Sequence, residues 1–424
     1  MQEDFLHYLW KHKKIDVSNI KTTDNEIINV LSVGQHNFNS GPDFFNAQLE
    51  IDNQLWAGNV EIHIKSSDWF LHNHELDKAY DNVILHVVWE HDTDVLRRNN
   101  TKIPTLELKA YVSKSALNNY EKLFSKSGKW INCESDFSSM NSFEMSNWLE
   151  RLYFERLERK SEDINTLLLT SKNDWEVVLF KMLVKNFGLK VNGDAFLSLA
   201  NSVNFSIIRK TLTDKTILEA LLFGQAGLLE HDIEDSYYLE LAKEYEFLKQ
   251  KFSLSNKNVI PIQFFRLRPP NFPTIRLSQV ATLYHQNQNL FSKIIEINSL
   301  EEFYDLFSVA TSPFWESHYT FDKFSKKSKK VLTKSFIDLL LINTIIPLKF
   351  SYAKFQGIHI EESIISLIES IASEENNIIE KFSSLKFVPT SALQSQGLLQ
   401  LKNEYCNKNK CLQCVIGNSL LHSN

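Results

Sequence analysis

The sequence predicts an α+β protein, with a strand-rich N-terminal domain followed by a large all-helical domain. Apolar residues alternate with polar ones in several short segments before about residue 110, which is typical of half-buried strands. From about residue 140 onward, apolar residues recur with the spacing of helices. The composition, with 43% hydrophobic and 23% charged residues and only 11 glycines and 9 prolines, favours packed helices over loop-rich architectures.

The N-terminal domain is expected to span residues 1–135 and to begin with an amphipathic helix over 3–12. Strands are expected at 27–33, 44–51, 56–65, 82–89 and 104–111. The fourth of these, NVILHVVW, is almost entirely apolar, as expected for a central strand that is covered on both faces. Asp52 and Asn53 predict a tight turn between the second and third strands.

The helical domain is expected to span residues 136–400. In SKNDWEVVLFKMLVKNFG, Asn173 or Asp174 is a candidate N-cap and Gly188 a candidate stop signal. Further helices are expected at 143–162, 213–229, 235–252, 274–285, 298–308 and 329–346. The apolar run 336–350 contains polar residues and is shorter than the roughly 20 residues that span a bilayer. We therefore expect a buried helix there and no membrane association.

Charge and cysteine usage limit the class of protein. The net charge of −6 means that any binding to nucleic acid must come from local basic patches. The polar N-terminal segment lacks the apolar stretch of a secretory signal. Four cysteines in 424 residues are too few for a disulfide framework. These features predict a protein of the reducing cytoplasm.

The strand around GNVEIHIK, residues 58–65, carries an unusual set of side chains. Its aliphatic residues point to one face, while Glu61, His63 and Lys65 point to the other. An acid, an imidazole and an amine in successive positions of one strand face are groups that can bind a metal ion and activate water. We therefore treat this face as a candidate catalytic surface, the alternative being an ordinary solvated strand face.

The hairpin that contains this strand resembles the PD-(D/E)xK nuclease superfamily, which has the restriction-endonuclease-like fold. Asp43 at the start of the preceding strand matches the first acid of that motif, and Glu61 matches the second. His63 occupies the lysine position, so Lys65 is an alternative for orienting the water. Glu3 matches the helical acid of some members. The resemblance implies that Asp43 and Glu61 bind Mg²⁺ or Mn²⁺ and that the substrate is DNA or RNA.

The register of the hairpin decides whether Asp43 and Glu61 can meet. With a two-residue turn at Asp52 and Asn53, Asp43 would face Ile62 and lie on the aliphatic side, away from Glu61. A one-residue shift reverses the face on which a side chain lies. The site therefore requires either a β-bulge near Gly58 or a rotation of the chain at Asp43.

Several histidines follow the candidate strand. His72 and His74 lie in SDWFLHNHEL, and His86 interrupts the apolar strand at 82–89. Imidazoles can contact a phosphate group or bind a transition metal such as Mn²⁺ or Zn²⁺. We expect at least one of His72 and His74 to lie at the site, whereas His86 fits a buried core histidine better.

Two further strings are specific enough to indicate a family. EALLFGQAG at 219–227 and RLRPPNFPTIRLSQVA at 266–281, with the N-terminal block, resemble an uncharacterised bacterial family known as domain of unknown function 2851. The resemblance covers nearly the whole chain. It implies no established activity.

The second of these strings also contains Arg266, Arg268 and Arg276 among aromatic and proline residues. Arginines beside aromatic rings suit single-stranded nucleic acid or phosphate groups, so we include these three as candidate substrate-binding residues. The alternative is a structural brace, with the arginine stems packed on phenylalanines. A lysine-rich run at 323–334 is the other local basic patch.

The C-terminal segment, residues 401–424, is rich in cysteine. Cys406, Cys411 and Cys414 have the spacing C-x₄-C-x₂-C, which suits tetrahedral coordination of zinc. Cys133 is the expected fourth ligand and His422 the alternative, so the tail is expected to pack near the domain junction. The same spacing admits an iron–sulfur cluster.

The sequence thus predicts a metal-dependent nuclease or phosphodiesterase in which the helical domain supplies the substrate surface. The alternatives are a non-catalytic binding or scaffold protein with a degenerate nuclease fold, and a hydrolase that binds a transition metal through its histidines and acts on a small phosphorylated substrate.

Overall fold

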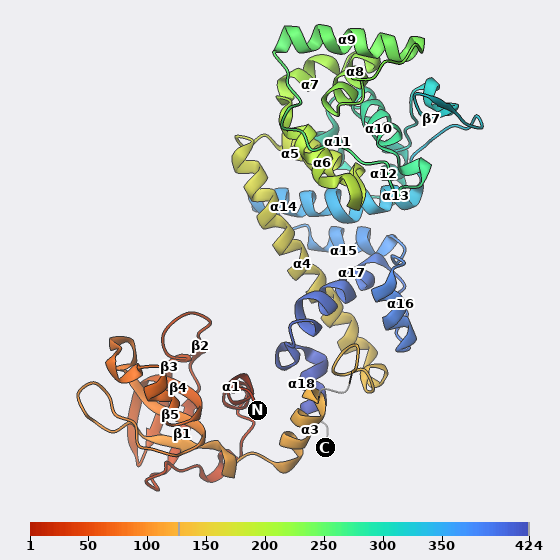
Figure 1. The fold of residues 1–424 in the computed structure, drawn as a ribbon. Coiled ribbons are helices and arrows are strands. Elements are labelled where there is room, and N and C mark those ends of the chain that lie inside the picture. Colours follow the sequence, from red (N-terminus) through yellow and green to blue (C-terminus); the bar gives the residue numbers. More distant parts are fainter. Residues whose placement is uncertain (126–127, 423–424) are drawn as a thin grey trace. The chain divides into compact units, whose positions relative to one another are not determined.

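The computed structural model describes residues 1–125 and 128–422, apart from the side chains of Ser18 and His422. The chain folds into two compact units, which are Met1–Met145 with Leu401–Asn424, and Ser146–Gln400. The strands of the main sheet belong to the first unit, and the second unit is largely helical (Figure 1). The predicted α+β class, with a sheet first and helices after it, is confirmed.

A mixed six-stranded sheet forms the centre of the first unit. Its strands run in the order β1-β3-β4-β5-β6, with the short β2 paired to β3. The β1/β3 and β3/β4 pairs are antiparallel, whereas β4/β5 and β5/β6 are parallel. The strands are β1 (Ile28–Ser32), β2 (Gln35–His36), β3 (Phe44–Ile51), β4 (Gln54–Lys65), β5 (Val83–Glu90) and β6 (Thr105–Glu107).

Four α-helices accompany this sheet: α1 (Glu3–Lys11), α2 (Asp68–Leu71), α3 (Lys114–Phe124) and, from the C-terminal segment, α18 (Val415–His422). The amphipathic pattern of α1 is realised, since Phe5, Leu6, Leu9 and Trp10 are all buried. This helix packs against β4, the strand that carries the candidate residues.

The second unit is built from helices around one extended apolar core. Their bounds are α4 (Ser142–Thr170), α5 (Trp175–Phe187), α6 (Leu189–Ser202), α7 (Phe205–Thr211), α8 (Lys215–Gln225), α9 (Ser236–Phe252), α10 (Pro273–Gln286), α11 (Leu290–Glu296), α12 (Leu300–Leu306), α13 (Lys334–Leu340), α14 (Ile346–Gln356), α15 (Glu361–Ser370), α16 (Asn377–Ser384) and α17 (Ala392–Gln400). A small hairpin of β7 (His318–Thr320) and β8 (Lys323–Phe324) is also present. Asp174 caps α5 as predicted, because its side chain accepts from the N–H groups of Glu176 and Val177.

Several predicted boundaries differ from the structure; the helix expected at 143–162, for example, runs from Ser142 to Thr170. The last strand ends at Glu107 because the chain turns there into a short 3₁₀ segment, Leu108–Ala110. The helix expected from residue 329 begins only at Lys334, where Thr333 supplies the N-cap. That helix continues through a π-helical turn at Leu341–Ile345 into α14.

The segment Lys334–Gln356 is therefore longer than the apolar run suggested. By length and composition alone it passes as a membrane span, and 78% of its most apolar window is buried within the structure. Such burial is the environment of a central helix in a packed unit, as the sequence predicted.

Candidate metal centre

A β-bulge in the β3/β4 hairpin sets the geometry of the candidate site. Near the turn the partners are Ile51 with Gln54 and Ala47 with Gly58, but further on Phe44 pairs with Val60, which is one residue out of step. Asn46 adopts a left-handed backbone (φ 55°) within this irregularity. The predicted shift of register therefore occurs, and it brings Asp43 opposite Glu61.

The two acids are joined through the backbone. The Asp43 N–H donates to Glu61 Oε2 (3.1 Å), and the Ile62 N–H donates to Asp43 Oδ2 (2.9 Å). Each carboxyl group thus keeps one oxygen available for another partner. The hairpin holds the two groups side by side, as a shared metal site requires.

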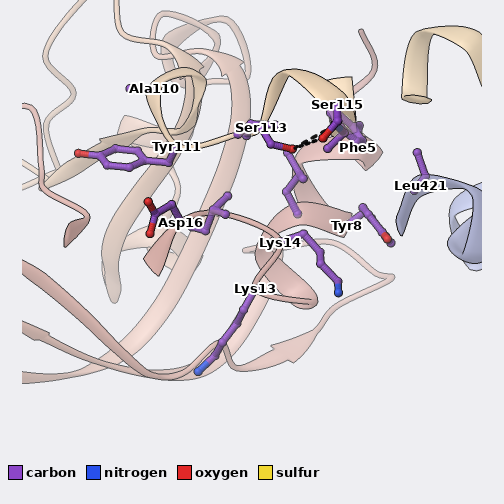
Figure 2. A pocket seen from close by; sticks show the side chains of 14 residues that line it. Phe5, Tyr8, Lys13, Lys14, Asp16, Ala110, Tyr111, Ser113, Ser115 and Leu421 are labelled. Carbon is purple, nitrogen blue, oxygen red and sulfur yellow. Dashed lines mark hydrogen bonds between the residues drawn. The ribbon is translucent and has the colours of Figure 1, made fainter. Parts of the chain in front are cut away.

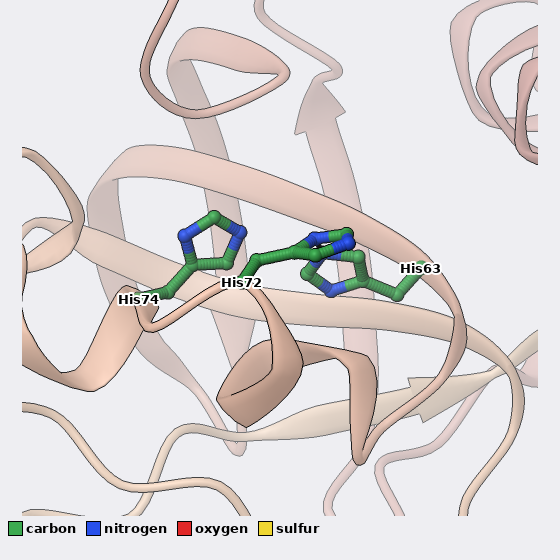
Figure 3. Close-up of side chains that lie close together, drawn as sticks. All are labelled: His63, His72 and His74. Carbon is green, nitrogen blue, oxygen red and sulfur yellow. Dashed lines mark hydrogen bonds between the residues drawn. The ribbon is translucent and has the colours of Figure 1, made fainter.

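Three histidines converge beside Glu61, and Figure 3 shows the rings of His63, His72 and His74 close together. One ligand nitrogen from each lies within 4.8 Å of the other two. His63 comes from β4, His72 follows α2, and His74 begins a 3₁₀ turn, His74–Leu76. The expectation that His72 or His74 lies beside the candidate strand is therefore met by both.

Three of the distances between donor atoms are those expected of groups that share one ion. His63 Nε2 lies 3.1 Å from His72 Nδ1 and 3.5 Å from Glu61 Oε1, and His74 Nε2 lies 3.3 Å from the same oxygen. Tetrahedral ligands at about 2.0–2.1 Å from a metal are about 3.3 Å apart. The His74 Nε2 atom is buried and has no hydrogen-bond partner among the described residues, so a bound ion would satisfy it.

An outer layer of side chains fixes these rings. His63 Nδ1 lies 2.9 Å from His86 Nε2, and Tyr80 stacks on His74 with ring centroids 3.8 Å apart. A metal-binding histidine usually donates its second N–H to another group, so His86 is the natural acceptor for the His63 Nδ1–H. His86 is fully buried, in agreement with its interpretation as a core residue, but it also contacts the site.

Burial and the closeness of the acids to one another govern the electrostatics of the site. Burial and the neighbouring Asp43 raise the pKa of Glu61 to about 9. Burial lowers the pKa of His63 to about 3 and also lowers the pKa of His74. These two imidazoles therefore stay neutral. Neutral imidazoles are metal ligands, and a cation would favour the ionised form of Glu61.

Helix α1 adds two residues to the site. His7 Nε2 lies 3.2 Å from Asp43 Oδ2, and burial together with Asp43 raises the pKa of Glu3 to about 7. Glu3 is the helical acid suggested by the nuclease resemblance. His7 was missed, although its position four residues after Glu3 places both on one face of a helix and could have revealed it.

Lys65 does not join the cluster. It is exposed, and its ammonium group makes no hydrogen bond or ion pair with any described residue. Its backbone N–H donates to Asp68 Oδ2 (2.9 Å), and its backbone pairs with Glu90 of β5. Of His63 and Lys65, only His63 therefore contacts the other groups of the site among the described residues.

The arginines and lysines of the second unit have different environments. Arg276 is buried, donates to Gln279 and Asn271, and lies 3.5 Å from the centre of the Phe336 ring, as the brace interpretation expects. Arg266 and Arg268 are exposed. In the lysine-rich run, Lys330 is buried and donates to backbone carbonyls, whereas Lys323, Lys326, Lys327, Lys329 and Lys334 are exposed.

The hollow beside α1 is separate from this centre. A cavity of about 520 Å³ is lined by Phe5, Tyr8, Lys13 and Tyr111 among others (Figure 2). None of the site's histidines or carboxyl groups lines it. The residues of α1 that line this cavity are Phe5, Tyr8 and Leu9, whereas Glu3 and His7 belong to the candidate site.

Fold and site together define an α+β protein in which a mixed sheet carries a histidine and carboxylate donor set. The model of the family "Protein of unknown function (DUF2851)" matches residues 3–377, and the chain belongs to this family. A search among curated proteins found no match, and neither did a search among solved structures.

Proposed function

We propose that this protein is a metal-dependent phosphodiester hydrolase that acts on DNA or RNA in the cytoplasm. The observation that carries the proposal is the convergence of His63, His72 and His74, whose ligand atoms lie within 4.8 Å of one another, with Glu61 Oε1 3.5 Å from His63 and 3.3 Å from His74 and with Asp43 beside Glu61. Donor sets of this kind, with one side open to solvent, are typical of hydrolytic metal sites.

The order of the residues supports a relation to the PD-(D/E)xK nucleases. Asp43 lies immediately before the first strand of the hairpin, Glu61 lies in the second, and Glu3 lies on the helix that packs against it. His63 stands two residues after Glu61, where those nucleases have lysine. The bulge at Asn46 provides the register that this arrangement needs.

The donor atoms favour a transition metal over Mg²⁺. Mg²⁺ prefers oxygen ligands and near-octahedral geometry, whereas imidazole suits Zn²⁺ and related ions. Three of the four closest donors here are imidazole nitrogens. We therefore expect Mn²⁺ or Zn²⁺ to support activity better than Mg²⁺.

The chain's own groups have distinct roles in the proposed reaction. The ion, when bound, lowers the pKa of coordinated water and offsets the charge of the phosphodiester. His72 is exposed, so this side of the site is open to a phosphate group. His7 holds Asp43 in place, and the carboxyl group of Glu3, whose pKa is about 7, can accept or return a proton near neutral pH.

A hydrolase for a small phosphorylated substrate is the second candidate, because the histidine-rich donor set suits that chemistry equally well. The exposed basic residues of the second unit, such as Arg266 and Arg268, favour a polyanion instead. Binding to nucleic acid should accordingly weaken steeply with salt, as the release of counterions requires. Affinity that does not change with salt would favour the small substrate.

The test is cleavage of labelled single- and double-stranded DNA and RNA by metal-free protein after addition of Mn²⁺, Zn²⁺ or Mg²⁺. Wild-type protein should cleave at least one substrate with Mn²⁺ or Zn²⁺, and Asp43→Asn should reduce the rate by more than about 100-fold, since even the outer partners of metal ligands matter by about 10–100-fold.

The matched control is Glu50→Gln. Glu50 lies near the hairpin turn in β3, the strand that follows Asp43, and its carboxyl group accepts from the Asn29 side chain. The activity of this variant should equal that of the wild type. Cleavage that survives chelation, or that Asp43→Asn leaves unchanged, would contradict the proposal. Binding of nucleic acid without any cleavage would support the scaffold alternative.

A further inference from the structure

Four cysteines from two distant segments of the first unit surround one small cavity. Cys133 follows α3, and Cys406, Cys411 and Cys414 lie in the C-terminal segment. The walls of the cavity are formed by the four cysteines with Leu123, Asn132, Leu401, Tyr405, Ile416 and Gly417. The fold thus places together all four cysteines of the chain, although Cys133 is far from the others in sequence.

Tight turns present the three C-terminal thiols to this cavity. Cys406 ends a π-helical turn, Leu401–Cys406, and its carbonyl accepts from the Asn409 N–H (3.2 Å). Cys411 begins a 3₁₀ turn, Cys411–Gln413, and Cys414 immediately precedes α18. A Cβ atom on Gly417 would lie 2.0 Å from the Cys411 carbonyl oxygen, so only glycine lets α18 pack this closely on the turn.

A polar group of the surroundings is directed at one of the sulfur atoms. Asn132, which directly precedes Cys133, donates from its side-chain amide to Cys411 Sγ (3.4 Å). A hydrogen-bond donor beside a buried sulfur suits a thiolate ligand of a metal, because it offsets the added negative charge.

Without a metal, this arrangement has no evident use. Cys133, Cys411 and Cys414 are buried, and no disulfide joins any of the four. Cysteines buried in apolar surroundings are usually unreactive. Four such groups facing one cavity are more readily explained as ligands than as reactive residues.

We propose that Cys133, Cys406, Cys411 and Cys414 bind one thiophilic metal centre, either a zinc ion or an iron–sulfur cluster. One zinc ion would hold neighbouring sulfurs about 3.8 Å apart, given Zn–S distances near 2.3 Å. Among the described residues, only the histidine cluster has three ligand atoms within 4.8 Å of one another. A zinc ion would therefore draw the cysteines closer, whereas a cluster of several irons accommodates a wider arrangement.

The centre would be structural, because it would join the C-terminal segment to the region of α1 and α3, and α1 carries residues of the candidate active site. The turn that contains Cys411 packs against α1, and α18 packs against α3. Phe5 of α1 stacks on Tyr120 of α3 with ring centroids 4.1 Å apart. The metal would thus stabilise α1, which carries Glu3 and His7, without contacting the reacting groups.

The test is the metal and sulfide content of full-length protein purified without chelators under nitrogen. One zinc per chain at this site with no colour indicates the ion, and iron with sulfide and visible absorption indicates the cluster. Cys133→Ser and Cys411→Ser should each remove this one centre, while His74→Ala removes only the ion at the histidines. Replacement by Co²⁺ should give thiolate-to-metal charge-transfer absorption, which histidine and carboxylate ligands do not produce.

The proposal is overturned if wild-type protein contains no metal that Cys133→Ser removes, or if the His74→Ala variant binds Co²⁺ without thiolate absorption. The rate at which a thiol reagent modifies the wild type gives a second measurement that does not depend on how well the variants fold. Metal-loaded protein should react far more slowly than chelated protein, and equal rates would contradict the site. This result is independent of whether the histidine centre hydrolyses nucleic acid.

Discussion

Two carboxyl groups, Glu61 in the sheet of the first unit and Glu219 in a helix of the second, are buried to similar degrees but have opposite surroundings. Glu61 is 5% exposed and Glu219 is 1% exposed, and burial raises the pKa of both carboxyl groups. Glu219 accepts hydrogen bonds from the hydroxyl groups of Tyr237, Ser278 and Ser312. Its oxygens are satisfied within the protein.

Glu61 has no such set of donors. It accepts one backbone N–H, and its other neighbours are neutral imidazoles and the acidic groups of Asp43 and Glu3, which raise its pKa further. A buried acid that is surrounded by hydroxyl donors is satisfied by the packing, whereas one that faces imidazole nitrogens and other carboxyl groups is placed to share a cation with them. The contrast is consistent with a structural role for Glu219 and supports the proposal that Glu61 binds a metal ion.

Replacing each acid by its amide should separate the two roles most strongly. Glu61→Gln removes a charged ligand, so Mn²⁺ affinity should fall by more than about 100-fold, while the metal-free protein remains folded. Glu219→Gln should leave Mn²⁺ affinity within about twofold but lower the free energy of unfolding by about 1–3 kcal/mol, because one oxygen acceptor is lost in a buried network. Titration with a competing chelator and urea unfolding measure these quantities. Equal effects of the two variants on metal affinity would contradict the assignment.

The strand face of Glu61 offers a second comparison, between His63 and Lys65. His63→Ala should weaken Mn²⁺ binding and cleavage by at least about 10–100-fold, since it removes a ligand. Lys65→Ala should change Mn²⁺ affinity and the cleavage rate by less than about twofold each, because the side chain is exposed and lies outside the cluster. Steady-state cleavage at saturating Mn²⁺ distinguishes them. If Lys65→Ala were the more severe change, lysine would be the water-activating residue.

The bulge that joins Asp43 to Glu61 can be tested at Asn46, whose φ of 55° suits asparagine or glycine. Asn46→Val should cost about 1–2 kcal/mol, because a β-branched residue is strained in this conformation. Metal affinity should fall by about tenfold as the register is perturbed, an effect of the size expected for outer partners of ligands. Asn46→Gly is the control and should retain metal binding. Wild-type affinity in Asn46→Val would show that the register does not depend on this residue.

The smallest expected effect is the change with pH in the contribution of Glu219 to the free energy of unfolding. The pKa of Glu219 is raised in the folded state, so above the unfolded value of 4.5 the folded protein retains a proton that the unfolded chain loses. The contribution of this group to stability should therefore decline as the pH rises from 4.5 toward its folded pKa. The stability difference between wild type and Glu219→Gln should accordingly shrink between pH 5 and pH 8 in urea unfolding. A difference that grows with pH would mean that the pKa is lowered instead.

Most of the fold followed from local patterns. Strand β3 was predicted at its observed bounds, 44–51, and Asp174 was one of two N-cap candidates for α5, because alternation and capping depend on neighbouring residues. The strand expected at 104–111 was too long, and the helix expected from 329 starts later. Those ends depend on a turn at Leu108 and a cap at Thr333, which the periodicity of the sequence does not specify.

The candidate site was predicted in part. The polar face of Glu61 and His63 was visible as strand alternation, and His72 and His74 were expected near it. His7 and the contact of His86 with His63 were not expected, because both depend on which helix covers the strand and on the parallel pairing of β4 with β5. Arg276 looked like a phosphate-binding residue in sequence, but its environment is a buried contact with Phe336.

The sequence by itself determined the α+β class, the hairpin with its two-residue turn, the types of ligand available and the grouping of three cysteines near the C-terminus. Each of these depends on residues that are close together along the chain, where steric and hydrogen-bonding preferences act directly. Only the tertiary structure decided that Asp43 faces Glu61, because the bulge reverses the side on which Asp43 lies. It also decided that three imidazoles meet at one carboxylate and that Cys133 joins the distant cysteines, since such contacts arise from the packing of segments that no local pattern relates.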